Sequence, residues 1–405
     1  MTSEVESERR HWRTELLVIQ PTPFCNIDCS YCYLPHRTSK QRMSLELAEQ
    51  IFSRLLTFPT IQDTVGLVWH AGEPMVLPVA YYEDMFTLVQ RLAGPKLDVL
   101  HSIQTNGTLL TDDWCDLIGK WRINLGLSID GPKEFHDLNR KYRNGSGSFD
   151  NAARGLRRLR ERGLPFYVIS VLTLPSLREP DKMFDFYVEN GIDNICFNIE
   201  EKEGNHTTSD LVDSREFGEL YRAFLGRFFD LAARRGQKMV IREFETPFRA
   251  IQHHGSPLSN QQAEPMSIVS VDCAGNLSTF SPELLGMEHA AYGSFTFGNV
   301  TTDDFETIAK RIEDSKVYAD IRAGIERCSR ECKYYKLCGG GPPANKIYEN
   351  NSANSTETVY CRSYQIAVDA VLDVIETKPQ ASHLMLQTQG PTPAQQAARE
   401  PAPAK

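Results

Sequence analysis

Strand and helix patterns alternate through the first 235 residues of the chain, and this alternation constrains the fold more than any other feature. Apolar, β-rich segments lie at residues 16–20, 65–70, 98–104, 124–128, 166–172 and 194–199. Helical patterns follow at residues 44–57, 80–92, 112–120, 150–162, 180–189 and 214–235. Six successive units predict an α/β fold in which parallel strands form a partial (βα)6 barrel, open on one side. Ligands of such folds gather at the C-terminal ends of the strands.

The composition fits a folded protein and excludes several classes. Hydrophobic residues make up 41% of the 405 residues and charged residues 24%, which excludes wholesale disorder. The net charge is 44 minus 53, or −9, so nucleic acid is not the expected partner. No run approaches the roughly 20 apolar residues that span a bilayer, and the polar N-terminus lacks an apolar signal core. We therefore expect a cytoplasmic protein without a membrane partner.

The alternation fades after about residue 236, where turn residues become frequent and only 303–313 and 364–376 show longer helical patterns. A loop-rich segment of this size buries little core unaided, so we expect a module organised by a metal. The expected division is a polar segment at 1–14, a barrel core at 15–235, a cluster-binding extension at 236–376 and a disordered tail at 377–405.

Three of the ten cysteines stand together directly after the first strand. Cys25, Cys29 and Cys32 have the spacing C-x3-C-x2-C. Soft thiolates select zinc, copper(I) or iron–sulfur clusters, and three of them can hold three irons of a [4Fe–4S] cube. The fourth iron then stays open, as a catalytic metal requires. A zinc site completed by a residue such as His36 is the alternative.

Polar residues and glycines also end the next three predicted strands. Gly72, Glu73 and Pro74 follow the second strand, Gln104 and Asn106 end the third, and Ser128 and Asp130 end the fourth. Each stretch alone is compatible with an ordinary strand-to-helix turn. Their shared position at successive strand ends indicates a ligand-binding edge.

The cysteine trio, with Tyr31 before its last member, and the sequence Gly72-Glu73-Pro74 resemble the radical S-adenosylmethionine (SAM) enzymes. The resemblance covers roughly residues 15–235. It implies that the three cysteines hold a [4Fe–4S] cluster whose open iron binds the amino and carboxylate groups of SAM. Electron transfer into SAM would then release a 5′-deoxyadenosyl radical that abstracts hydrogen from the substrate.

The same resemblance assigns cofactor contacts at the strand ends. Glu73 would meet the SAM ammonium group, while Gln104, Ser128 and Arg140 would meet the ribose and the carboxylate. A guanidinium group suits a carboxylate because it can bind it through two charged hydrogen bonds. The expected cofactor-binding residues are Tyr31, Gly72, Glu73, Pro74, Gln104, Asn106, Ser128, Asp130 and Arg140.

A second set of cysteines comprises Cys328, Cys332, Cys338 and the more distant Cys361. Four thiolates complete one closed site, which by chemistry alone is zinc or a second [4Fe–4S] cluster. The spacing resembles the SPASM extension of radical SAM peptide maturases, which favours the cluster. A further cysteine that full SPASM domains carry after C-x5-C is replaced here by Gly-Gly-Gly-Pro-Pro, and Cys273 alone makes no site. We therefore expect one auxiliary [4Fe–4S] cluster rather than two.

Short stretches at 17–24, 278–286, 338–341, 345–346 and 356–358 resemble the cyclophane-forming maturases of glycine-rich-repeat precursor peptides. The resemblance implies a ribosomally made precursor peptide as substrate and an electron donor such as flavodoxin or ferredoxin. The reaction would join an aromatic ring carbon to the β-carbon of a residue two positions later, giving a three-residue cyclophane. Glu283, in a Ser-Pro-Glu turn, is the candidate base for the ring proton, although it could instead only stabilise the turn.

Two other functions remain open at this point. A SPASM-type maturase of the sulfatase-maturing kind would oxidise a single Cys or Ser side chain to an aldehyde. A zinc-bound scaffold or peptide-binding protein would lack catalysis and would be colourless.

Overall fold

The computed structural model of the chain describes residues 12–252 and 260–378. Most of the expected polar N-terminal segment, and the expected tail from residue 379 onward, lie outside the described residues. The first residue assigned to that tail, Thr377, is the last residue of a long helix, α16 (Val359–Thr377).

One curved sheet of ten strands organises the described chain, in the order β12-β9-β8-β1-β2-β3-β4-β5-β6-β7. Its first six strands are β1 (Thr14–Ile19), β2 (Ile61–Trp69), β3 (Asp98–Thr105), β4 (Asn124–Ser128), β5 (Phe166–Leu172) and β6 (Asn194–Ile199). These six strands are parallel, which confirms the predicted α/β fold with a partial barrel. Strand β2 begins four residues before the expected start because three exposed polar residues extend it beyond its apolar run.

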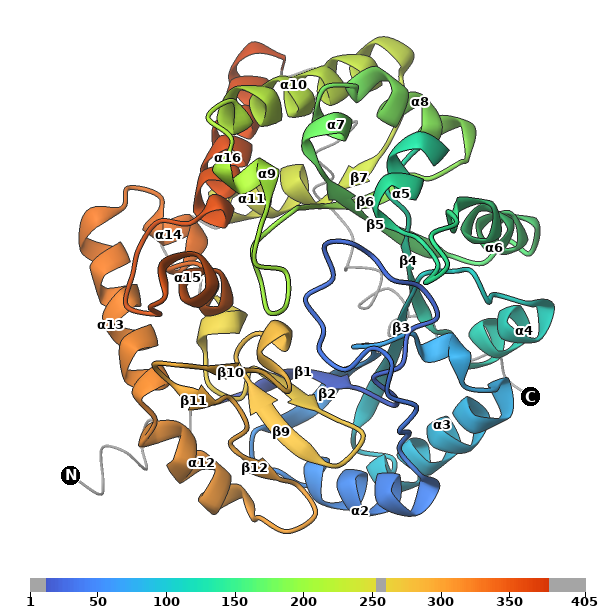
Figure 1. Cartoon of the computed structure of the whole chain (residues 1–405), viewed down its shortest axis with the longest axis vertical. Coiled ribbons are helices and arrows are strands. Elements are labelled where there is room, and N and C mark those ends of the chain that lie inside the picture. Colours follow the sequence, from blue (N-terminus) through green and yellow to red (C-terminus); the bar gives the residue numbers. More distant parts are fainter. Residues whose placement is uncertain (1–11, 253–259, 379–405) are drawn as a thin grey trace.

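Helices cover the outer face of the curved sheet, and loops fill its centre (Figure 1). The helices of the first half are α2 (Leu45–Leu55), α3 (Val79–Ala93), α4 (Asp112–Trp121), α5 (Lys133–Asn139), α6 (Phe149–Glu161), α7 (Leu174–Leu177), α8 (Pro180–Glu189), α9 (Asp210–Asp213) and α10 (Phe217–Arg235). Local chemistry fixes their ends: in α4, the Thr111 side chain accepts a hydrogen bond from the backbone N–H of Trp114, and Arg122 ends the helix in the left-handed conformation.

The C-terminal third extends the same sheet. Strand β8 (Ile268–Val271) pairs in parallel with β1, and β9 (Asn276–Thr279) and β12 (Gly298–Asn299) add antiparallel strands at that edge. The other short strands are β7 (Val240–Ile241), β10 (Glu288–His289) and β11 (Gly293–Ser294). Strands of two to four residues have too little periodicity to be recognised in sequence.

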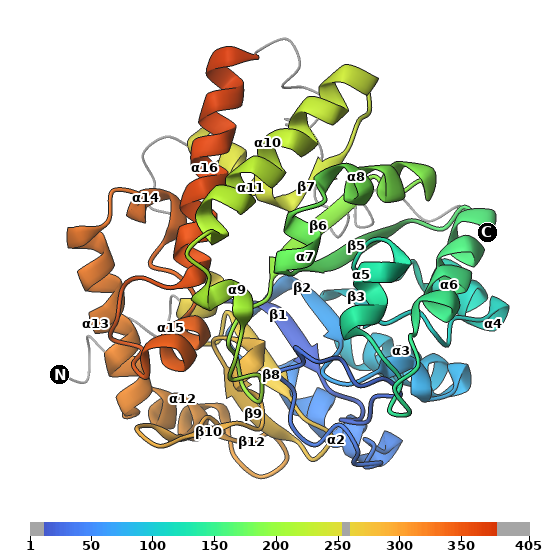
Figure 2. The same cartoon turned by 45° about the horizontal axis from the view of Figure 1, so that its top comes forward.

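The helices of this third are α11 (Arg242–Gln252), α12 (Phe305–Glu313), α13 (Lys316–Glu331), α14 (Tyr335–Cys338), α15 (Pro343–Asn350) and α16. Helix α13 has 16 residues, which corrects the expectation of only two longer helices beyond residue 236. Helix α16 begins five residues before the expected start, where Thr358 caps it. It packs against α10 and α11, as Figure 2 shows. No helix among the described residues is long and apolar enough to span a bilayer.

Two hydrophobic clusters hold these layers together. One is built around Trp69, Phe86 and Trp114, and it joins β1–β4 to α2, α3, α4 and, in the C-terminal third, to β8, β9 and α12. The other is built around Tyr187 and Phe228, and it joins β5 and β6 to α8, α10 and α16. Both clusters pack helices against the strands of the sheet.

Candidate functional site

The loop between β1 and α2 carries the first cysteine trio and is fixed by the backbone of neighbouring loops. The N–H of Cys25 donates to the carbonyl of Arg37 at 3.1 Å, and the N–H of Ser30 donates to that of Asn139 at 3.0 Å. An isolated bridge between Ile27 and Tyr142 adds a third tie. The cysteine loop therefore lies at the C-terminal edge of the sheet, as predicted from its position after the first strand.

Burial makes these thiols poor acids unless something compensates the charge of the thiolate. It raises the pKa of Cys25 to about 12, with Glu73 and the two other cysteines adding to the effect. It likewise raises the pKa of Cys29 to about 11, although Arg140 opposes the shift. Three mutually close thiols from one loop match the donor set of a site-differentiated cube. Within the described residues, no three His, Cys, Asp or Glu side chains converge on one point as ligands of a single metal ion.

The Gly72-Glu73-Pro74 turn ties the ends of β2 and β3 together. A Cβ atom on Gly72 would lie 2.2 Å from the carbonyl oxygen of Thr22, so only glycine fits beside the cysteine loop. The Glu73 carboxylate is buried and accepts hydrogen bonds from the Thr105 hydroxyl at 2.7 Å and the Asn106 N–H at 2.8 Å. Burial raises its pKa. A contact between Glu73 and the SAM ammonium group remains a prediction.

Gln104 and Ser128 lie side by side on the inner face of β3 and β4. The Gln104 amide donates to the Ser128 hydroxyl at 2.9 Å. Gly126 makes this arrangement possible, because a Cβ atom there would lie 1.9 Å from Oε1 of Gln104. Sequence reasoning missed Gly126, since a glycine inside a strand signals a close approach without naming the partner.

Tyr31, Asp130 and Arg140 form one buried network beside the cysteine loop. Arg140 donates to both oxygens of Asp130, at 2.9 Å and 3.0 Å, and its guanidinium group lies 5.4 Å from the centre of the Tyr31 ring. The Tyr31 hydroxyl donates to the same carboxylate in a short hydrogen bond. The structure thus brings Arg140 to the expected strand edge, but its guanidinium group pairs with Asp130.

The four C-terminal cysteines line a single cavity of about 350 Å³ between α13, α14 and α16. Burial raises the pKa of Cys338 to about 11, with Cys361 and Cys328 among the causes. Lys346 is buried beside them, with its Nζ atom 3.6 Å from Sγ of Cys328. A cavity lined by four thiols, with a buried cation beside one of them, suits a thiolate-bound, negatively charged group. Sequence reasoning gave Lys346 no role, because only the fold brings α15 against α13.

Cys273 does not line this cavity. It follows β8, at the turn into β9, and burial raises its pKa to about 11. Its position agrees with the expectation of one auxiliary site, which remains a prediction.

Glu283 lies in the short helix η3 (Pro282–Leu284), next to Leu285, which packs on Leu34 and Ala71 at the cysteine loop. Its Oε2 atom is buried and has no hydrogen-bond partner, and burial raises the pKa of the carboxyl. Glu201 and Glu203 lie in the loop after β6, and burial together with the charges of Glu283 and Glu201 raises the pKa of Glu203. Sequence reasoning missed these two residues because a Glu-rich loop resembles a solvated one.

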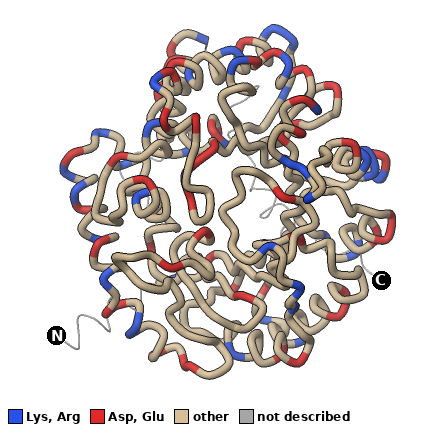
Figure 3. Tube along the Cα trace, in the orientation of Figure 1, with Lys and Arg blue, Asp and Glu red and all other residues tan. Residues whose placement is uncertain are grey.

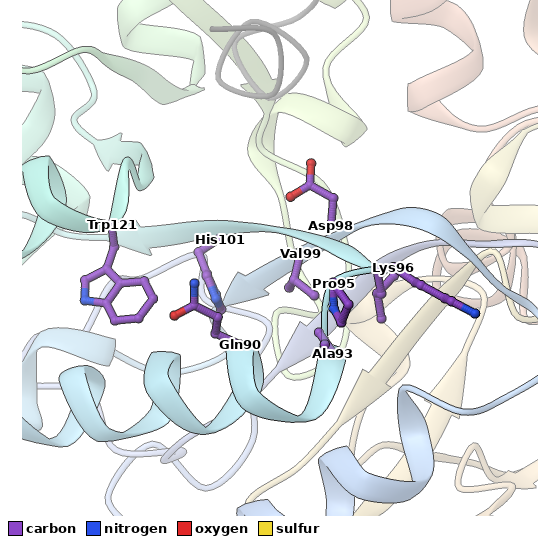
Figure 4. Close-up of a pocket in the computed structure, with 10 residues that line it drawn as sticks. Gln90, Ala93, Pro95, Lys96, Asp98, Val99, His101 and Trp121 are labelled. Atoms are coloured by element: carbon purple, nitrogen blue, oxygen red, sulfur yellow. The ribbon is translucent and has the colours of Figure 1, made fainter. Parts of the chain in front are cut away.

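A second cavity of about 460 Å³ lies at the opposite end of the sheet. Figure 4 shows His101, Trp121 and Gln90 on its wall, between the first half of β3 and α3. Its β3 residues, Asp98, Val99 and His101, lie in the first half of the strand, whereas Gln104 is next to its C-terminal end, so this cavity forms no part of the site at the C-terminal strand ends.

The fold and the site together define a class: partial α/β barrels that hold a thiolate-bound cluster at the C-terminal edge of the sheet. Residues 19–197 match the model of the Radical SAM superfamily. The uncharacterised protein sll1766 of Synechocystis is 39% identical over 90% of this chain and 92% of its own length. The chain belongs to the radical SAM superfamily and is an enzyme. The expected [4Fe–4S] cluster and SAM are the cofactors of that superfamily.

More distant relatives are also similar over most of their length. The serine-type anaerobic sulfatase-maturating enzyme of Bacteroides thetaiotaomicron is 25% identical over 84% of this chain and 85% of its own. The fold matches a structure of anSMEcpe with bound AdoMet and Cp18Cys peptide, with a TM-score of 0.73, 23% identity and coverage of 91% and 99% of the two chains. It also matches Streptococcus suis SuiB bound to precursor peptide SuiA, with a TM-score of 0.61, 17% identity and coverage of 89% and 78%.

Proposed function

We propose that this enzyme matures a ribosomally synthesised precursor peptide by joining an aromatic ring carbon to the β-carbon of a nearby residue, giving a three-residue cyclophane. The observation that carries the proposal is the placement of a partly buried acidic group, which includes Glu283 with its buried and unpartnered Oε2 atom, between two separate cysteine sets. Solved relatives with bound peptides support a peptide substrate.

The residues that would hold the cofactors follow from the site. Cys25, Cys29 and Cys32 would bind the first cluster, and Gln104 and Ser128 offer polar groups to SAM from the inner face of the sheet. The four cysteines of the C-terminal cavity would bind one auxiliary cluster: Cys328, Cys332, Cys338 and Cys361. Lys346 would offset part of its negative charge.

When loaded, these groups supply the radical that removes the β-hydrogen and the acceptor for the electron released as the ring regains aromaticity. Glu283 then takes the proton from the ring carbon, so the peptide loses two hydrogens in all and gains one carbon–carbon bond. Burial raises the pKa of this carboxyl, which makes the Glu283 carboxylate a stronger base than one in water.

The electron that starts each cycle would come from flavodoxin or ferredoxin in the cytoplasm. A reducing compartment would also keep the seven cluster-binding cysteines free of disulfides.

The second candidate is the oxidation of a single Ser or Cys side chain to an aldehyde. The whole-chain similarity to sulfatase-maturating enzymes favours it. Cross-linking and serine oxidation both remove two hydrogens, so intact mass alone does not separate them.

Tandem mass spectrometry on the encoded precursor peptide, treated with the anaerobically reconstituted enzyme, tests the two. A cross-link suppresses backbone fragments between the aromatic residue and its partner, and it forms no aldehyde. An aldehyde reacts with hydroxylamine and leaves every backbone bond free to fragment. Hydroxylamine capture would therefore replace the first candidate by the second.

A further inference from the structure

Four carboxyl groups meet between the two cysteine sets, and we call Glu201, Glu203, Glu283 and Glu349 the acidic cluster. In addition to burial, the negative charges of the three other carboxylates raise the pKa of Glu203. Those of Glu349 and Glu283 also raise the pKa of Glu201. In Figures 1 and 2, the loop after β6 lies between the N-terminal cysteine loop and α15. Figure 3 shows acidic positions where this loop enters the centre of the molecule.

Specific contacts hold this arrangement. The N–H of Asn205 donates to the carbonyl of Tyr33 at 3.0 Å, and a Cβ atom on Gly204 would lie 2.5 Å from that same oxygen. The tip of the loop is therefore pressed against the residue that follows Cys32. On the opposite side, Glu349 accepts a hydrogen bond from the N–H of Val359 at 2.9 Å, which fixes α15 against the start of α16.

The acidic cluster lacks matching positive charge. The charge of Arg242 lowers the pKa of Glu201, and the charges of Lys202 and Arg362 lower that of Glu349. However, Arg242 already forms an ion pair with Glu243, and Lys202 forms one with Asp213. No basic side chain in the described parts of the chain contributes at Glu203 or Glu283. Carboxylates gathered in partly buried positions without cations are unfavourable, and a proton or an incoming cation would neutralise them.

Unsatisfied polar atoms in the same place point to a binding site. Asn345 is only 2% exposed, and its amide nitrogen has no hydrogen-bond partner although it lies close enough to Glu201 to lower the pKa of that carboxyl. The Tyr348 hydroxyl, Oε2 of Glu283 and Oε1 of Glu349 are also buried without partners. Buried polar groups are normally satisfied, so several unsatisfied atoms around one cluster mark a binding site.

Two aromatic rings border the cluster. In addition to burial, the charges of Glu283 and Glu203 raise the pKa values of both Tyr33 and Tyr348, so both rings lie near these two carboxylates. Carboxylates beside aromatic rings are the combination that receives an alkylammonium or guanidinium group, through ion pairing and cation–π attraction.

We propose that Glu201 and Glu203 of the acidic cluster bind a lysine or arginine side chain of the peptide substrate and so set the register of that peptide between the two cysteine sets. This inference rests on the proposed peptide-maturing function, and it adds a requirement for a cationic residue near the aromatic one. Glu203 and Glu201 are positioning and specificity residues, distinct from the base Glu283.

Binding of two blocked pentapeptides to the anaerobically reconstituted, SAM-loaded enzyme tests the proposal. The probes are acetyl-Gly-Trp-Gly-Lys-Gly-amide and its counterpart with norleucine in place of lysine, which removes only the charge. We expect the lysine peptide to bind at least tenfold more tightly at pH 7.5. In Glu203→Gln and Glu201→Gln variants this preference should fall below threefold, because the cation loses its partner.

Glu189→Gln is the matched control, since Glu189 is exposed on α8 and should leave the preference unchanged. SAM cleavage without peptide, followed as 5′-deoxyadenosine, reports that each variant is folded and loaded. Equal affinity of the wild-type enzyme for both peptides would overturn the proposal. So would tight binding of Mg²⁺ or Ca²⁺ alone that Glu203→Gln abolishes, because the cluster would then be a metal site. Failure of the cross-linking reaction with an intact lysine preference would refute the proposed reaction and leave this inference standing.

Discussion

At the scale of single residues, the site is made of polar side chains whose partners come from other strand ends. Asp130 binds both Arg140 and Tyr31, and Glu73 binds groups from the end of β3. These contacts fix the cysteine loop relative to the sheet before any cofactor binds. Preorganisation of this kind lowers the cost of binding a charged ligand.

Glu283→Gln should lower the yield of cross-linked peptide by roughly 100-fold or more, because a general base contributes about 10²–10⁴ in rate. SAM cleavage to 5′-deoxyadenosine should continue in the variant, since that step does not need the ring proton to leave. Liquid chromatography of both products measures the split between them.

Glu283→Asp keeps a carboxyl group and should recover part of the yield. Full cyclisation by Glu283→Gln would show that the residue only stabilises its turn and would remove it from the mechanism.

At the scale of elements, helix α16 links the second hydrophobic cluster to the C-terminal cysteine cavity. Its first turn carries Cys361, and its remaining turns pack against α10 and α11. Thr358 caps the helix by accepting from the N–H of Cys361 at 3.3 Å, and its hydroxyl also lies 3.5 Å from Sγ of that cysteine.

Thr358→Ala should therefore lower the free energy of unfolding by about 1 kcal/mol, the usual cost of losing an N-cap. It should also reduce the iron held at the C-terminal site, because the first turn then frays around Cys361. Thermal unfolding and iron analysis measure the two effects.

Ser44→Ala is the matched control, since Ser44 caps α2 in the same way, with a 3.2 Å bond from the N–H of Leu47. It should cost similar stability and leave the iron content unchanged. Equal iron in both variants would show that the cap does not position Cys361.

At the scale of the whole molecule, one sheet joins the barrel to the C-terminal third, because β8 pairs with β1 and places that third beside the barrel. The chain from β8 onward reaches the cysteine loop through Leu285, which packs on Leu34 and Ala71. The two cysteine sets are thus parts of one folded unit, with the acidic cluster between them.

The reconstituted wild-type enzyme should hold about eight irons per chain, and a Cys25/Cys29/Cys32→Ala variant about four, because each cube has four. Iron and sulfide analysis of anaerobically purified protein measures this. About twelve irons would mean a further site that includes Cys273. Four irons in the wild type, all lost in the variant, would leave zinc or nothing at the C-terminal site. Zinc without iron would contradict the radical mechanism.

Much of the fold could be predicted from the sequence, because the patterns that indicate its strands and helices are local. Strands β4, β5 and β6 lie at the predicted residues, since each is a short apolar run bounded by turn residues. The cysteine trio could also be recognised, because its three members follow one another within eight residues. Cofactor chemistry constrains such spacing directly.

The tertiary structure alone decided the rest. Strand β8 is only four residues long, and its pairing with β1 joins segments about 250 residues apart, which no local pattern reports. Lys346 beside Cys328, Arg140 paired with Asp130, and the meeting of Glu203 with Glu283 likewise depend on how distant loops pack. Local periodicity and cysteine spacing can be recognised in the sequence, because they involve residues close together in the chain. The charge around a site depends instead on which elements the fold brings together.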